Sequence, residues 1–328
     1  MKFMLAGYGS RGDVEPCAAV GRELLRRGHD VRMAVSPDMI DFVGAAGLTA
    51  VAYGPDTREQ MDAGAEFVRN VANPFSALPE VMEHLSQMWA EKTATLTSLA
   101  KDADLLLAGI NEQELAAIVA EYCDIPLAAL HFFPARVLST GVLYSSMTKG
   151  VAEAHRRALG LPEATGRSRP ALEIQAYDEL CLPGPAAEWV ESDGRRPFVG
   201  ALTLGLPTDT DDEVLSWIAA GTPPICFGLG STPISFPADM VAMISAACTQ
   251  LGERALICSG PMTSPMSRVS TTSRLWTRCA TRPSFRLAAR SSTTAAPAAR
   301  PRACGPEFPR WSCGSGSINR SGRQASNG

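Results

Sequence analysis

The residues best suited to chemistry lie in one short loop near the start of the chain. The loop follows an apolar run and reads Gly9-Ser10-Arg11-Gly12-Asp13-Val14-Glu15-Pro16. The carboxylate of Asp13 is able to take a proton from a substrate hydroxyl, which is general-base chemistry. Asp13 also has a simpler interpretation as the N-cap of a helix, and the residues alone favour that interpretation.

The glycines of this region also fit a dinucleotide-binding turn. Gly7, Gly9 and Gly12 follow the pattern G-x-G-x-x-G, in which backbone N–H groups and a helix N-terminus face a phosphate. Arg11 and Asp13, however, occupy the place where a pyrophosphate needs bare backbone, and no acidic residue closes the second expected strand. A nicotinamide-binding oxidoreductase is therefore the weaker alternative.

Metal and disulfide chemistry find little support. The nine cysteines stand singly and the four histidines are scattered, so we expect no metal site, no disulfide framework and no bound cofactor. The composition, 45% hydrophobic and 20% charged, is typical of a soluble globular protein. No apolar run approaches roughly eighteen residues, and the apolar start is too short for a signal peptide, so a cytoplasmic protein is expected.

The loop needs a rigid frame, and the surrounding pattern predicts one. Strands are expected over 2–6, 30–35, 48–53, 103–108 and 125–130, with helices over 13–28, 37–45, 75–101 and 112–122. Residues 134–180 are mixed and helical in part. This alternation predicts an α/β fold, a parallel sheet covered by helices on both faces. The loop then lies at the carboxyl edge of the sheet, where such folds bind ligands.

A second unit of the same kind begins near Asp211. Helices are expected over 213–220 and 239–251, and strands over 224–228 and 254–258. The first of these strands is followed by the turn Gly228-Leu229-Gly230-Ser231-Thr232, which repeats the strand–glycine turn–helix order of the first unit. Gly-Ser-Thr is also common turn chemistry without any ligand.

The chain changes character after Pro261. From Met262 onward it has eleven Arg, no Lys, one Glu and no Asp, a balance of +10, so the first 261 residues carry −4 − 10 = −14. A basic arm that binds nucleic acid usually contains Lys as well, so we expect no nucleic-acid partner. The hydrophobic periodicity also ends here, and residues 262–328 are expected to be disordered.

The opening loop resembles that of the family-1 glycosyltransferases of the GT-B type. Their Gly-Ser-x-Gly-Asp-x-x-Pro loop is matched at five positions: Gly9, Ser10, Gly12, Asp13 and Pro16. Arg-Gly-His-Asp-Val at 27–31 and Gly-Leu-Thr-Ala-Val at 47–51 are similar too, and the resemblance covers about residues 1 to 261. It is strongest toward bacterial enzymes that glycosylate glycopeptide antibiotics, macrolides, sterols and lipids.

The resemblance implies a complete N-terminal Rossmann-like domain and a truncated C-terminal one. Residues 1–195 would form the acceptor-binding domain and 196–210 a linker. Residues 211–261 would begin the donor-binding domain, and 262–328 would be an aberrant tail. The implied activity is transfer of a hexose from a UDP- or TDP-sugar to a hydroxyl of a lipid-like or natural-product acceptor, by direct inverting displacement. A lipid acceptor would add peripheral contact with a membrane.

Roles for individual residues follow from the resemblance. Asp13 would be the general base, and Ser10 would lie near the donor diphosphate. The second glycine turn would approach the same diphosphate through Gly230, Ser231 and Thr232. His131 and Phe133 would line the acceptor pocket, although a structural role explains both equally well. The nucleotide sugar is a co-substrate, and no metal is implied.

The donor motif of this family, His-x-Gly-Gly-x-Gly, is absent from the sequence. When the codons for Thr293 to Pro309 are shifted back by one base, they become compatible with HHGGAG, a short Ser/Thr/Ala run and GLRAG(I/V)P. We therefore expect a frameshift near Pro261. Two hypotheses stay open, an active transferase and an acceptor-binding remnant without enzymatic activity.

Overall fold

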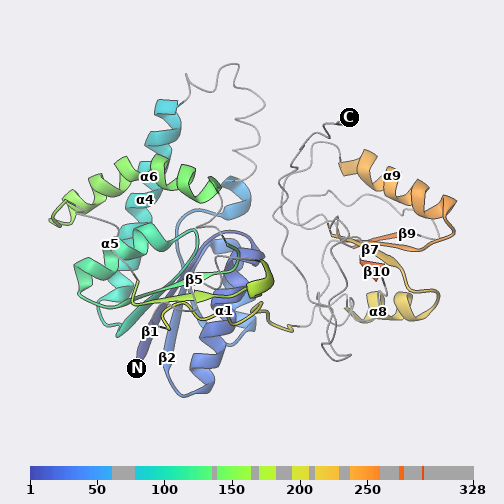
Figure 1. Cartoon of the computed structure of the whole chain (residues 1–328), viewed down its shortest axis with the longest axis horizontal. Coiled ribbons are helices and arrows are strands. Elements are labelled where there is room, and N and C mark those ends of the chain that lie inside the picture. Colours follow the sequence, from blue (N-terminus) through green and yellow to red (C-terminus); the bar gives the residue numbers. More distant parts are fainter. Residues whose placement is uncertain are drawn as a thin grey trace, which may run out of the picture.

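The structure is a computed structural model. It describes residues 1–60, 78–134, 139–163, 170–181, 194–206, 211–228 and 237–258, together with two short strands at 273–276 and 290–291. Figure 1 shows the whole chain, coloured from the N-terminus to the C-terminus.

The first domain is built on a sheet of six parallel strands. These are β1 (Lys2–Gly7), β2 (Asp30–Val35), β3 (Thr49–Ala52), β4 (Leu105–Gly109), β5 (Leu127–His131) and β6 (Leu172–Gln175). Their order is β3-β2-β1-β4-β5-β6. The chain thus winds from β1 to β3 and then crosses to the other side of β1. The carboxyl ends of β1 and β4 bound the switch point at which open α/β sheets bind ligands.

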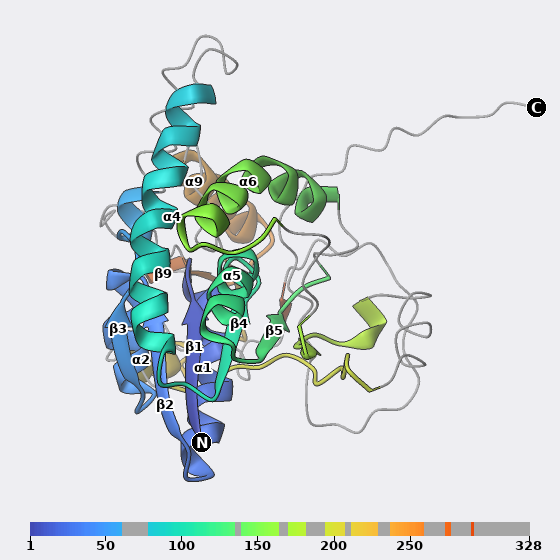
Figure 2. The same cartoon turned by 90° about the vertical axis from the view of Figure 1, so that its left-hand side faces the viewer.

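Helices cover both faces of this sheet (Figure 2). They are α1 (Arg11–Arg26), the 3-10 helix η1 (Pro37–Met39), α2 (Ile40–Ala45), α4 (Leu78–Ala100), α5 (Gln113–Cys123) and α6 (Ser139–Ala158). The alternation of β1 explains the layers, since Met4 and Ala6 pack in one core with α4, α5 and α6, whereas Leu5 packs in another with α1 and α2. The predicted parallel sheet with two covered faces is confirmed.

The edge of the sheet is extended by the segment that leaves the domain. The Gln175 N–H donates to the Pro197 carbonyl at 2.8 Å, and the Val199 N–H donates to the Gln175 carbonyl at 2.9 Å. Further along, the Leu204 N–H donates to Oε1 of Glu15 on α1 at 2.7 Å. Of the expected linker 196–210, the described part up to residue 206 is therefore docked on the first domain.

The second unit repeats this winding. Its strands are β7 (Ile225–Gly228), β8 (Ala255–Cys258), β9 (Ser273–Trp276) and β10 (Arg290–Ser291), and its helices are α8 (Asp211–Ala219) and α9 (Pro237–Gln250). The parallel order β10-β7-β8-β9 corresponds to β4-β1-β2-β3 in the first sheet. Separate apolar clusters join α8 and α9 to the strands.

Strands β9 and β10 fall within the tail that we expected to be disordered. These strands have four and two residues, and segments this short show no recognisable hydrophobic pattern in the sequence. The other residues of the tail lie outside the described part of the chain. Among the described residues, no helix is long and apolar enough to cross a membrane.

Candidate active site

Helix α1 begins with a capping box that includes Asp13. Ser10 is the N-cap, and its carbonyl accepts hydrogen bonds from the N–H groups of Asp13 (2.9 Å) and Val14 (3.1 Å). The Asp13 carboxylate turns back, so that its Oδ2 accepts hydrogen bonds from the Ser10 N–H at 2.7 Å and from Ser10 Oγ at 2.9 Å. The prediction of Asp13 as the N-cap was wrong by three residues, because the extended backbone of Ser10 already starts the helix.

Gly9 makes room for this carboxylate. Its φ is +129°, and a Cβ at this position would lie 2.5 Å from Oδ2 of Asp13. Any side chain would therefore strain the backbone and collide with the carboxylate. The glycine is needed for the placement of Asp13 as well as for the turn.

The second oxygen of the carboxylate contacts a residue from the neighbouring strand. Asn111 follows β4, and its Nδ2 donates to Oδ1 of Asp13 at 3.1 Å and to the Tyr8 carbonyl at 3.2 Å. The contact spans the switch point between β1 and β4. Asn111 was not predicted from the sequence, although a polar residue two positions after Gly109, at the end of an apolar strand, is the signal that locates it.

Burial raises the pKa of Asp13 above its ordinary value. The hydrogen bonds from Ser10, and then the one from Asn111, act in the opposite direction and limit this increase. A carboxylate with a raised pKa is a stronger base at neutral pH. The electrostatics of the site thus favour proton acceptance.

The nearest buried thiol is inert. Cys17, one helical turn after Asp13 on α1, is fully buried. Burial, with further contributions from the charges of Asp13 and Glu112, raises the pKa of Cys17 to about 12. A thiol of this kind stays protonated and does not act as a nucleophile.

A buried ion pair lies behind the loop. Lys92 Nζ on α4 is 2.6 Å from Oε1 of Glu112, and the two side chains are 4% and 2% exposed. The Tyr53 hydroxyl donates to the other oxygen of Glu112. Lys92 Nζ also lies 3.7 Å from the centroid of the Tyr8 ring, a cation–π contact with the residue that precedes Gly9.

The other expected site residues are placed less informatively. His131 ends β5 at the same sheet edge, but it is only 2% exposed and belongs to the core. Phe133 is partly buried, with its ring centroid 5.6 Å from that of Phe132. Gly230, Ser231 and Thr232 lie outside the described residues, so their role on the donor side stays a prediction.

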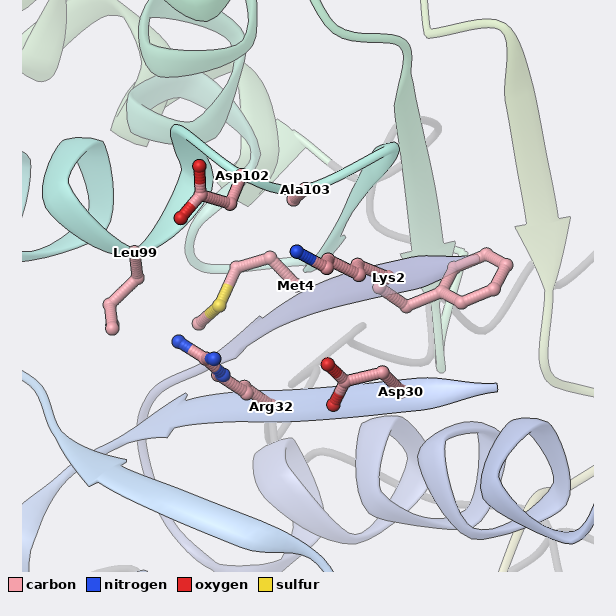
Figure 3. A pocket seen from close by; sticks show the side chains of 8 residues that line it. Lys2, Met4, Asp30, Arg32, Leu99, Asp102 and Ala103 are labelled. Atoms are coloured by element: carbon pink, nitrogen blue, oxygen red, sulfur yellow. The ribbon is translucent and has the colours of Figure 1, made fainter. Parts of the chain in front are cut away.

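A small pocket lies at the opposite edge of the sheet (Figure 3). It is lined by residues from the amino ends of β1 and β2, including Lys2, Asp30 and Arg32, and by Asp102 after α4. Its volume of about 20 Å³ is enough for one water molecule. It is therefore not an acceptor site. Among the described residues, no group of three or more potential metal ligands is found.

Comparison with known proteins identifies the family of the chain. Residues 3–140 match the Glycosyltransferase family 28 N-terminal domain. An uncharacterized glycosyltransferase of Mycobacterium tuberculosis is 56% identical over 290 residues, which cover 80% of this chain and 69% of the relative. The chain belongs to the GT-B glycosyltransferases.

The chain is also similar to more distant glycosyltransferases. The vancomycin aglycone glucosyltransferase of Amycolatopsis orientalis is 27% identical over 299 residues, 79% of this chain and 67% of the relative. The calicheamicin glycosyltransferase CalG4 superimposes with a TM-score of 0.62 at 17% identity, over 84% of this chain and 70% of the other. The structural likeness confirms the fold expected from the opening loop.

Proposed function

We propose that the first domain binds a hydroxyl-bearing acceptor and that Asp13 is the general base of glycosyl transfer. The observation that carries this proposal is the carboxylate at the switch point, held by Ser10 and Asn111 and given a raised pKa by its burial. A base is needed here because an alcohol is a weak nucleophile until its proton is removed.

The hydrogen bonds indicate which oxygen takes the proton. Oδ2 of Asp13 already accepts two hydrogen bonds from Ser10, whereas Oδ1 accepts one from another described residue, Asn111. Oδ1 therefore retains a lone pair for the acceptor hydroxyl. As the proton moves to Oδ1, the acceptor oxygen forms a bond to the anomeric carbon. The bond from that carbon to the diphosphate breaks on the opposite side, so the configuration inverts and a nucleoside diphosphate leaves.

We further propose a UDP- or TDP-hexose as donor and a natural-product or lipid-like hydroxyl compound as acceptor. Family membership supports a nucleotide sugar, and the glucosyltransferase relative that acts on the vancomycin aglycone supports a hexose and an antibiotic-like acceptor. Transfer of this kind needs no metal at Asp13, since the carboxylate alone accepts the proton of the acceptor hydroxyl.

The donor side is where this chain departs from its family. We propose that residues after Pro261 are read out of frame and that the chain as written binds nucleotide sugar only weakly. The relatives quoted above match 80% and 79% of the chain, and the 261 residues before Met262 make up 261/328, about 80%, of it. An acceptor-binding remnant without transfer is the corresponding alternative function.

Two proteins separate these possibilities, namely the chain as written and a version with the frame restored by one base near codon 261. Calorimetry with UDP- and TDP-sugars should give micromolar binding to the restored protein and much weaker binding to the chain as written. Micromolar binding by the chain as written would refute the frame proposal. Product formation from a panel of hydroxyl acceptors then tests transfer by the restored protein.

Replacing the base tests the mechanism. In the restored protein, Asp13→Asn should lower kcat by about two or more orders of magnitude, as loss of a general base does. The Michaelis constant for the donor should change less than kcat, because Asp13 is linked to the proposed donor side only through its hydrogen bonds with Ser10. Near-normal kcat in this variant would reduce Asp13 to a capping residue.

A further inference from the structure

We propose that Asn111 is a positioning residue for Asp13, and that the buried Lys92–Glu112 pair holds Asn111 in place. The proposal deepens the function proposed above, because it takes Asp13 as the base. By this proposal, the loop between β4 and α5 orients the carboxylate of Asp13. Asp13 lies in the segment after β1, residues 9–16, which is called the catalytic loop below.

Asn111 fixes the catalytic loop at two points. One amide nitrogen donates both to Oδ1 of Asp13 and to the carbonyl of Tyr8, the residue before Gly9. The backbone of the loop and its carboxylate are thus tied to the same group. An amide also stays neutral at every pH at which the protein is folded, whereas an aspartate here would set a second negative charge beside Asp13.

The position of Asn111 is in turn fixed by its neighbours. The Glu112 N–H donates to the Gly109 carbonyl at 2.9 Å, which closes the turn around Asn111. The Glu112 side chain is anchored by Lys92, and the same Lys92 nitrogen packs on the Tyr8 ring. The buried Lys92 ammonium therefore contacts two neighbours of Asn111. One is Glu112, the next residue in the chain, and the other is Tyr8, whose carbonyl accepts a hydrogen bond from Asn111.

The test must separate the effect of nearby charges on the pKa of Asp13 from the effect of how Asn111 is positioned. Cys17 on α1 is the titratable group whose pKa responds to the Asp13 charge. The Tyr8 carbonyl at the end of β1 accepts a hydrogen bond from Asn111, and Glu112 before α5 forms its ion pair with Lys92 on α4. Removal of Lys92 alone would leave Glu112 as an uncompensated buried anion. A test of positioning therefore removes both charges of the pair together.

The experiment is a pH titration of the Asp13 side-chain carboxyl carbon by NMR in the full chain, which requires no turnover. Asn111 is exposed, so its variants should fold. Asn111→Ala should raise the titration midpoint of Asp13, because a hydrogen bond to the charged form is lost. Asn111→Asp should raise it further by adding a like charge. The double variant Lys92→Met/Glu112→Gln should shift the midpoint in the same direction as Asn111→Ala.

A second ion pair provides the matched control. Arg156 on α6 binds Glu121 on α5 through two contacts of 2.7 Å, and neither residue contacts the catalytic loop in the described contacts. Arg156→Met/Glu121→Gln should therefore leave the Asp13 midpoint at the wild-type value, even where it lowers stability. A merely structural role for Lys92 and Glu112 predicts no shift from either pair.

The outcomes distinguish this proposal from the proposed function. An unchanged midpoint in folded Asn111→Ala overturns the positioning role, whether or not the restored enzyme transfers sugar. A raised midpoint supports it, even where no acceptor is glycosylated. In a restored enzyme that transfers sugar, Asn111→Ala should move the acidic limb of the kcat pH profile upward with the NMR midpoint; a limb that stays in place contradicts the assignment.

Discussion

At the scale of single residues, the proposed base Asp13 is also part of a helix cap, two roles that the sequence offered as alternatives. Its Oδ2 closes a capping box with Ser10, and its Oδ1 faces Asn111 across the switch point. A helix cap and a catalytic base are compatible because a carboxylate has enough lone pairs for both. The cap holds the group still, and the remaining lone pair is free for a substrate proton.

The raised pKa of Asp13 makes a prediction about stability. Since the folded-state pKa lies above the unfolded value, the native carboxyl binds its proton more tightly, and the free energy of unfolding falls as pH rises through that interval. Asp13→Asn removes this dependence. Urea unfolding can be measured from pH 3 to pH 8 at intervals of about one pH unit. The free energy of unfolding of the variant should rise relative to that of the wild type as pH rises. A relative gain by the wild type would show that its hydrogen bonds outweigh its burial.

Gly9 gives a second prediction at this scale. Gly9→Ala forces a Cβ to within 2.5 Å of the Asp13 carboxylate at a φ of +129°, so we expect a loss of about 1 kcal/mol or more in the free energy of unfolding. In the restored enzyme, kcat should fall as the carboxylate is displaced. Gly44→Ala on α2 is the control, because no atom lies within 4 Å of its added Cβ. Equal effects of the two variants on kcat would contradict the steric argument.

At the scale of elements, most strands of the first sheet were predictable and the contacts between elements were not. Apolar runs located β1, β2, β4 and β5 within one or two residues, because buried parallel strands are nearly continuously hydrophobic. Strand β6 was missed since Leu-Glu-Ile-Gln alternates over only four residues. Lys92 on α4 pairs with Glu112, the residue before α5, and no local pattern of spacing marks such a contact.

The Lys92–Glu112 pair makes a prediction about how α4 is attached. Burial lowers the pKa of Lys92, opposed by the charge of Glu112, so either group alone is costly. Lys92→Met should lower the free energy of unfolding by about 3–5 kcal/mol, whereas Lys92→Met/Glu112→Gln should recover most of that loss. Chemical denaturation of both variants measures the difference. A double variant as unstable as the single one would mean that the cation–π contact with Tyr8, not the charge balance, dominates.

At the scale of the whole molecule, the first domain includes the segment that leaves it. Glu15 on α1 binds the Leu204 N–H, and the buried Glu173 carboxylate binds Arg196 at 3.0 Å. In Glu15→Ala, hydrogen exchange at the Leu204 amide should accelerate about tenfold or more, as loss of one hydrogen bond of about 1.4 kcal/mol implies. The amide of Val199, bonded to β6, should exchange unchanged. Acceleration at both amides would mean that the segment detaches as one piece.

This docked segment also matters for building hybrid enzymes. Hybrid enzymes of the GT-B type can be built by fusing the acceptor half of one enzyme to the donor half of another. A crossover at residue 196, where the expected linker begins, would separate Glu15 and Glu173 from their partners Leu204 and Arg196. A crossover placed after residue 206 keeps both bonds together with helix α1, and so leaves the surroundings of Asp13 intact.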